Sequence, residues 1–98
     1  MITEIAVVDI VPGDEKDFEL ALHTAVSTVL SKAQGYLTFQ LHKGIENPST
    51  YTFLIEWETL EDHTIGFRES DLFSQWRALI GKHFANPPRV EHWQSITL

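Results

Sequence analysis

The chain has 98 residues, of which 43% are hydrophobic and 21% charged, and these proportions are typical of one ordinary globular domain rather than a disordered or membrane-spanning chain. It contains no cysteine, which excludes disulfides, thiolate nucleophiles and cysteine-ligated zinc or iron–sulfur clusters. The net charge of −7, with seven scattered Lys and Arg residues, argues against nucleic acid or anionic lipid as the partner.

The N-terminal third predicts a strand followed by a helix. Residues 2–11 are rich in β-branched side chains and end at Pro12-Gly13, a sequence typical of a turn. Asp14 is a suitable cap for a helix from about 15 to 33, in which apolar residues recur at spacings of three and four until Gly35. The start of the chain also lacks the features of a signal peptide, so we expect a cytoplasmic protein.

Two alternating segments, 36–43 and 51–58, predict a β-hairpin. If Lys43 lies opposite Tyr51, one face of the hairpin is apolar and should lie under the helices. That face carries Leu37, Phe39, Leu41, Phe53, Ile55 and Trp57. The opposite face carries Thr38, Gln40, His42, Thr52, Leu54 and Glu56.

The remaining residues predict two helices and a last strand. A short helix from Thr59 to residue 65 is interrupted by Gly66, and Ser70 starts a second helix that ends before Asn86-Pro87-Pro88. Residues 90–98 read as the final strand. The order β-α-β-β-α-β predicts an α+β fold over residues 1–98, a single ferredoxin-like domain with a four-stranded antiparallel sheet.

Both faces of the first strand are mostly apolar, as expected for a strand that is covered on both sides. The helices cover only one of these faces, and the chain has no further element for the other. A second copy is the natural cover, so the sequence predicts a symmetric homodimer.

The segment 55–84 gathers groups that suit an aromatic ligand. Trp57, Phe67, Phe73 and Trp76 are candidate walls for a planar substrate, although aromatics at these spacings are more often plain core. Arg68 is a candidate anchor for a substrate oxygen, or else a surface partner of a neighbouring glutamate.

Several motifs resemble the antibiotic biosynthesis monooxygenase domain over nearly the whole chain. They are Gly35-Tyr36-Leu37, Glu56-Trp57-Glu58, Glu61-Asp62-His63 and Gly66-Phe67-Arg68-x-Ser70-x-x-Phe73-x-x-Trp76. The resemblance implies a dimeric α/β barrel, with a pocket between the sheet and the helices of each subunit. It also implies oxidation of a quinol or polyphenolic compound by molecular oxygen, without a metal, haem or flavin cofactor.

A neighbouring branch of the family degrades haem, and its pocket is expected to carry an asparagine, a tryptophan and a histidine. The corresponding positions here are Ala6, Phe67 and Arg77, which argues against haem, although His83 lies nearby on the same helix. The sequence shows no recognisable metal motif, phosphate-binding glycine loop or serine-hydrolase elbow.

Oxygenation of a phenol requires a base, and His63 is the best candidate by sequence. It is equally compatible with a histidine that merely bonds a nearby carboxylate. His42 is a candidate substrate contact, but its strand face favours an interface role, and His83 and His92 are weaker candidates. Asp9, a charge among apolar residues, is either a buried acid with a raised pKa or a group at the strand edge.

Three functions are therefore open. The first is a cofactor-independent monooxygenase with His63 as base. The second is a non-catalytic dimeric binding or stress-response module that uses the same pocket. The third is a protein that binds and degrades haem.

Overall fold

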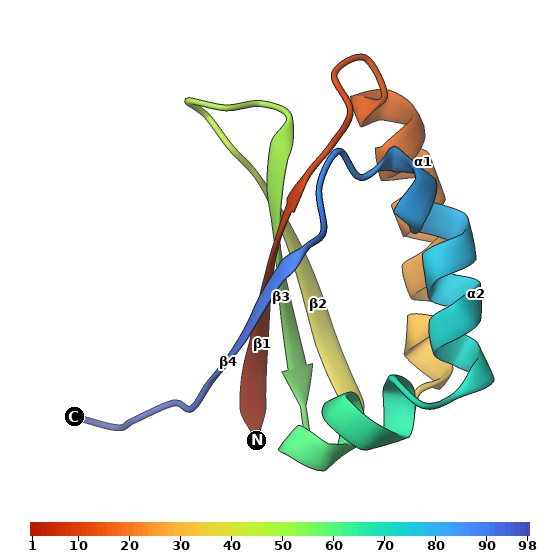
Figure 1. The fold of residues 1–98 in the computed structure, drawn as a ribbon. Coiled ribbons are helices and arrows are strands. Elements are labelled where there is room, and N and C mark those ends of the chain that lie inside the picture. The colour runs from red at the N-terminus through yellow and green to blue at the C-terminus, as the bar shows by residue number, and fades with distance from the viewer.

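The computed structural model describes residues 1–98. Its four strands form one antiparallel sheet in the order β2-β3-β1-β4, and both long helices lie along the same face of the sheet (Figure 1). The ferredoxin-like prediction is therefore confirmed. The strands are β1 (Ile2–Asp9), β2 (Tyr36–Lys43), β3 (Thr50–Trp57) and β4 (Arg89–Trp93), and the helices are α1 (Glu15–Thr28), η1 (Leu30–Lys32), η2 (Asp62–Phe67), α2 (Asp71–Ile80) and η3 (Gly81–His83).

The hydrophobic core lies between the sheet and the helices. Every second residue of β1 and β3 is buried, as expected for strands with one face under helices. Trp57 and Phe18 are fully buried, and Phe18 of α1 stacks on Phe53 of β3 with ring centroids 6.1 Å apart. None of the helices is both long and apolar enough to cross a membrane.

The predicted hairpin register is confirmed, with Lys43 opposite Tyr51, but one face assignment is wrong. A register shift between Tyr36 and Thr38 places Tyr36 opposite Trp57. Its ring therefore packs edge-on against Trp57, with centroids 6.2 Å apart, whereas Leu37 is 40% exposed. The bulge lets the larger aromatic ring fill the end of the core.

Several predicted boundaries are also wrong. The first helix ends at Thr28, and η1 follows it in place of further α-helical turns. The last strand ends at Trp93 because β4 pairs only with β1, between Thr3 and Val7, and has no partner beyond that point.

The short helix after β3 differs most from its prediction, because it contains a π-helical segment, η2, that continues through Gly66. The Arg68 amide donates to the His63 carbonyl, five residues earlier, over 3.1 Å. A π turn is wider than an α turn and often occurs at functional sites. Here it buries both His63 and Phe67.

Gly35 enters β2 with a φ of 81°, and a Cβ at this position would overlap the Asp62 side chain. We expect Gly35→Ala to lower the free energy of unfolding by the left-handed strain of about 1 kcal/mol plus the cost of displacing Asp62. Gly13→Ala is the matched control, because Gly13 has a φ of 99° but open space around it. Equal losses for the two variants in urea unfolding would contradict this account.

Candidate active site

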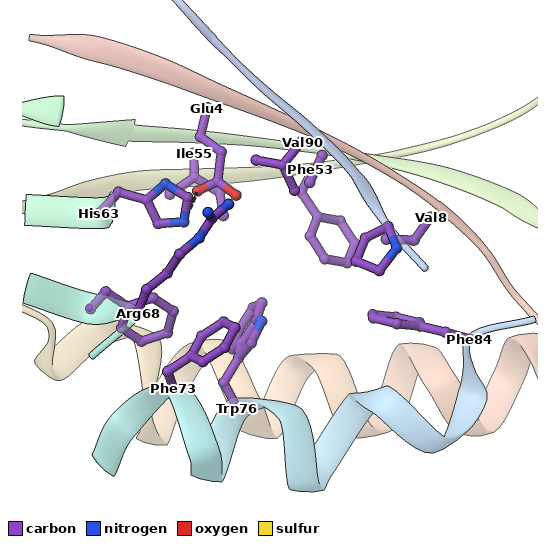
Figure 2. A pocket seen from close by; sticks show the side chains of 13 residues that line it. Glu4, Val8, Phe53, Ile55, His63, Arg68, Phe73, Trp76, Phe84 and Val90 are labelled. Carbon is purple, nitrogen blue, oxygen red and sulfur yellow. Dashed lines mark ion pairs between the residues drawn. The ribbon is translucent and has the colours of Figure 1, made fainter. Parts of the chain in front are cut away.

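A cavity of about 540 Å³ lies between the sheet and the helix layer, a size suited to a small organic molecule. Its walls are mostly apolar, and aromatic rings project into it from β3, η2 and α2 (Figure 2). Three polar side chains, Glu4, His63 and Arg68, gather at one end of the cavity (Figure 2). The apolar lining residues are Ala6, Val8, Phe53, Ile55, Phe67, Phe73, Trp76, Phe84, Pro88 and Val90.

The polar end is organised around Glu4, which is 5% exposed. The Trp57 indole N–H donates to Glu4 Oε1 over 3.0 Å, and His63 Nε2 lies 3.3 Å from the same oxygen. The other ring nitrogen of His63, Nδ1, lies 2.8 Å from Nε2 of His92 on β4. Glu4, His63 and His92 thus form a continuous chain of close polar contacts.

Burial controls the ionisation of this chain. Desolvation raises the pKa of Glu4 to about 7, against the opposing effects of the Trp57 hydrogen bond and the Arg68 charge. Desolvation also lowers the pKa of His63 to about 3, and the charge of Arg68 and the neighbouring His92 act in the same direction. His63 is therefore neutral at pH 7, and its 3.3 Å contact with Glu4 is not an ion pair at that pH.

Arg68 supplies a positive charge to the cavity. It follows directly after η2, and its side chain extends toward Glu4 (Figure 2). None of the ion pairs in the structure includes Arg68. Its guanidinium is thus available to a ligand oxygen that carries negative charge.

Sheet pairing explains how distant residues meet at the polar end. Glu4 shares the helix-facing side of β1 with Ala6 and Val8, which line the same cavity. The register of β1 with β4 places His92 directly beside Glu4. The π turn of η2 then brings His63 over both of them.

Five residues singled out from the sequence line this cavity together: His63, Phe67, Arg68, Phe73 and Trp76. Two others do not line it. Trp57 is fully buried behind His63, with the two rings stacked at 5.1 Å, and its indole N–H donates to Glu4, so it supports lining residues without lining the cavity itself. His42 is exposed on the opposite face of the sheet, 3.4 Å from Gln40.

Asp9 does not behave as the buried acid that was one of its two predicted states. Arg89, Thr50 and Asn86 donate hydrogen bonds to its carboxylate, and they lower the pKa of Asp9 instead of raising it. His83 lies outside the cavity, and its Nδ1 is 3.1 Å from an Asp14 oxygen.

Sequence reasoning missed Glu4 and gave too little weight to His92. A signal for Glu4 was present, because a carboxylate in the alternating apolar series of Ala6, Val8 and Ile10 must be buried with them. His92 had no comparable local signal, since its role depends on the pairing of β4 with β1.

The cluster holds two histidines and one carboxylate, a set that also occurs in metal sites. Here, however, His63 uses its two ring nitrogens on opposite partners, so the three groups lie in a chain and do not converge on one point. No group of three or more potential ligands in the structure has a geometry suited to a metal ion.

Comparison with known proteins places this site in a family. The model of the antibiotic biosynthesis monooxygenase family matches residues 1–79 of the chain, which include Glu4, His63 and both α2 residues of the cavity, Phe73 and Trp76. The chain belongs to this family. The matched part of this monooxygenase-family protein ends before β4, so His92 lies outside it.

Individual relatives agree with the assignment. The uncharacterised protein YczJ of Bacillus subtilis (strain 168) is 42% identical over 96 residues, which cover 98% of this chain and all of YczJ. A Bordetella bronchiseptica protein, provisionally named an antibiotic biosynthesis monooxygenase, is 41% identical with a TM-score of 0.92, covering 98% of this chain and 97% of its own.

A more distant structure shows the same fold. It is a monooxygenase from the gene ActVA-Orf6 of Streptomyces coelicolor, in complex with the ligand nanaomycin D. It has 11% identity and a TM-score of 0.82, with coverage of 99% of this chain and 88% of that chain. At this identity the match supports the fold alone.

The raised pKa of Glu4 predicts a pH-dependent stability difference between the wild type and Glu4→Gln. Glu4 ionises near 4.5 in the unfolded chain and at about 7 in the folded one, so its favourable contribution is complete below 4.5 and is lost as the pH rises through 7. Between pH 4.5 and pH 7 the difference in free energy of unfolding between Glu4→Gln and the wild type should therefore shift by about 3 kcal/mol in favour of the variant.

Urea unfolding of both proteins at several pH values measures this difference. The lowered pKa of His63 makes the free energy of unfolding rise with pH, but this contribution largely cancels because both proteins contain His63. Glu91→Gln, which removes an exposed carboxylate on β4, is the control and should show a flat difference. A flat difference for Glu4→Gln as well would mean that Glu4 ionises normally in the folded protein.

Proposed function

We propose that the protein is a cytoplasmic, homodimeric, cofactor-independent monooxygenase that oxidises a quinol or polyphenolic aromatic compound with molecular oxygen. The observation that carries this proposal is the pairing of an aromatic cavity with a polar end where Glu4 lies beside the guanidinium of Arg68. Membership of the antibiotic biosynthesis monooxygenase family supports it independently.

The cavity is well suited to a flat aromatic ring. Phe73 and Trp76 approach from α2, and Phe53 and Ile55 approach from β3 on the other side (Figure 2). A hydroxyl group on the ring can then reach Glu4 and Arg68, where both a proton acceptor and a positive charge are present. Such a site binds the ring by apolar contact and orients it by its oxygen.

In the proposed reaction, ionised Glu4 accepts the proton of the substrate hydroxyl. A base whose pKa lies near 7 is well matched to this task at neutral pH. Arg68 stabilises the resulting aryl oxyanion, and the mostly apolar lining of the cavity strengthens this interaction. The electron-rich ring is then the reductant for molecular oxygen.

The proposed oxidation balances without another electron donor. A ring carbon forms a bond to one oxygen atom and gives up its hydrogen, the O–O bond breaks, and the second oxygen atom leaves as water. For a hydroquinone the product is a hydroxyquinone. The proton held by Glu4 returns to the departing oxygen, so the enzyme ends in its starting state.

This proposal assigns His63 a supporting part. Its Nδ1 is hydrogen-bonded to His92 and its Nε2 lies 3.3 Å from Glu4, and its low pKa leaves it a weak proton acceptor. We propose that Glu4 and His63 act as one unit, in which Glu4 receives the proton and the imidazole holds the carboxylate in place.

We propose that the homodimer forms through the open face of the sheet. Ile5 and Val7 of β1 lie on this face beside Leu54 of β3, and Trp93 of β4, which is 54% exposed, lies at its edge. Such a patch is an apolar surface suited to a second copy. The cavity is on the opposite face of the sheet, so each subunit would keep its own site.

Oxygen uptake tests the proposed reaction. Wild-type protein should consume oxygen with a hydroquinone or an anthrone-like substrate, and Glu4→Gln should lower kcat by about 100-fold or more through loss of the base. His63→Ala should also lower kcat, because it removes the support of Glu4. His23→Ala, which removes an exposed imidazole from α1, is the control and should retain the wild-type rate.

If no aromatic substrate consumes oxygen faster than buffer does, the oxygenase proposal fails. Saturable quenching of Trp76 fluorescence by such a compound without turnover would then favour the non-catalytic binding module, because Trp76 lines the cavity. A shift of the haem Soret band on titration would instead favour the haem alternative.

Sedimentation velocity tests the dimer. Leu54→Glu should convert the dimer to monomer, because it places a charge in the centre of the apolar face. Leu20→Glu is the matched control, since Leu20 is 66% exposed on α1 and far from the sheet face. A monomeric wild type, or a Leu54→Glu variant that remains dimeric, would contradict the proposed interface.

A further inference from the structure

We propose that Glu4, His63 and His92 form a proton path through which the buried carboxyl group exchanges its proton with solvent on the β4 side, while the cavity is filled by a ligand. The existence of the path rests on geometry alone. Its use in turnover rests on the proposed function.

Three observations establish the connection. The links from Glu4 to His63 and from His63 to His92 measure 3.3 and 2.8 Å, and they use opposite nitrogens of the His63 ring. Glu4 and His63 are buried, whereas His92 is only partly buried on the edge strand of the sheet. The chain therefore leads from the inside of the molecule toward its surface.

The chain transfers one proton without a net charge on either imidazole. When Glu4 is protonated, His63 Nε2 is unprotonated and lies 3.3 Å from the carboxyl group, and His63 Nδ1–H donates to His92 Nε2. On ionisation, the Glu4 proton moves to His63 Nε2, the Nδ1 proton of His63 moves to His92 Nε2, and the Nδ1 proton of His92 passes to water. Both histidines exchange their tautomers, and uptake of a proton by the same path restores them.

The surrounding groups favour this neutral transfer over a charged imidazole. His63 on η2 and Arg68, the residue after η2, face Glu4. His92 lies beside Glu4 on β4, and the Trp57 indole of β3 donates a hydrogen bond to it. Arg68 is the one charged group that acts on all three members of the chain, and its positive charge disfavours a cationic histidine. A proton can therefore pass along the chain but is not held there.

The path has a clear use in the proposed reaction. At neutral pH a substantial share of Glu4 is protonated, and that share cannot act as a base. A substrate in the cavity covers Glu4 and excludes water from it. The histidine path lets Glu4 ionise after the substrate has entered. The path lies on the face of the sheet opposite to the proposed dimer contact, so a dimer would not block it.

The test follows the ring nitrogens of ¹⁵N-histidine-labelled protein by NMR from about pH 6 to pH 9. In the wild type, the His63 and His92 ring protons should change from Nδ1 to Nε2 together, with one midpoint, as Glu4 ionises. Glu4→Gln should lose this pH-dependent change. A single tautomer at all pH values in the wild type, or a cationic His63, would overturn the path.

A second variant tests the role of His92, which acts through His63 and does not contact the cavity. In His92→Phe, exchange of the His63 ring proton with water should slow by about tenfold or more, equivalent to about 1.4 kcal/mol of added barrier. Glu91→Gln on the same strand is the control and should keep the wild-type rate. Unchanged exchange in His92→Phe would overturn the path.

These measurements need no substrate, so they separate the two proposals. A coupled tautomer change without oxygen uptake would support the path and count against the oxygenase. Oxygen uptake with fixed tautomers would support the oxygenase and remove the path.

Discussion

A carboxyl group on the buried face of β1 is the constraint around which the polar end of the cavity is arranged. Glu4 occupies a position at which its neighbours in the alternation, Ala6 and Val8, are apolar. A buried carboxyl group without partners is strongly destabilising, so it requires donors at fixed positions. The Trp57 indole at the end of β3 supplies such a donor, and His63 on η2 lies 3.3 Å from the same carboxyl oxygen. The bulge in β2 and the π turn of η2 are the local irregularities beside these two side chains.

The polar groups of the cavity lie at one end, so a ligand with one polar group would bind in a defined orientation. Most of the cavity lining is aromatic or aliphatic, whereas Arg68 and Glu4 share one end. Beside such a mostly apolar lining the positive charge of Arg68 acts more strongly than it would in bulk water. After the Trp57 hydrogen bond, it helps to hold the pKa of Glu4 below the value that burial alone would produce, and it adds to the lowering of the His63 pKa that burial causes. One side chain thus tunes both a proton acceptor and the group that supports it.

The sequence predicted the architecture well because hydrophobic alternation and turn residues are local signals. The segment 55–84 placed Phe67, Phe73 and Trp76 in one region, and these side chains line one cavity. What it could not predict depends on long-range pairing: the position of His92 beside Glu4 follows from the register of β4 on β1. The sequence also did not predict the bulge that turns Tyr36 toward the core and Leu37 outward, since either residue fits the inward position of an alternating strand. The strand pattern correctly placed His42 on the face away from the helices, which favoured the interface role over a substrate contact.

The edge position of β4 has a consequence for how this cavity works. His92 lies outside the part of the chain that matches the family model, on a five-residue strand that only β1 holds in place. A short edge strand is among the less stable parts of a sheet, because only one side of it is hydrogen-bonded. Separation of β4 from β1 would remove His92 from His63 and open the chain to water, while Trp57 would still hold Glu4 from the central strand β3. The carboxyl group is thus held from the central strand β3, whereas its connection to His92 depends on the pairing of the edge strand β4.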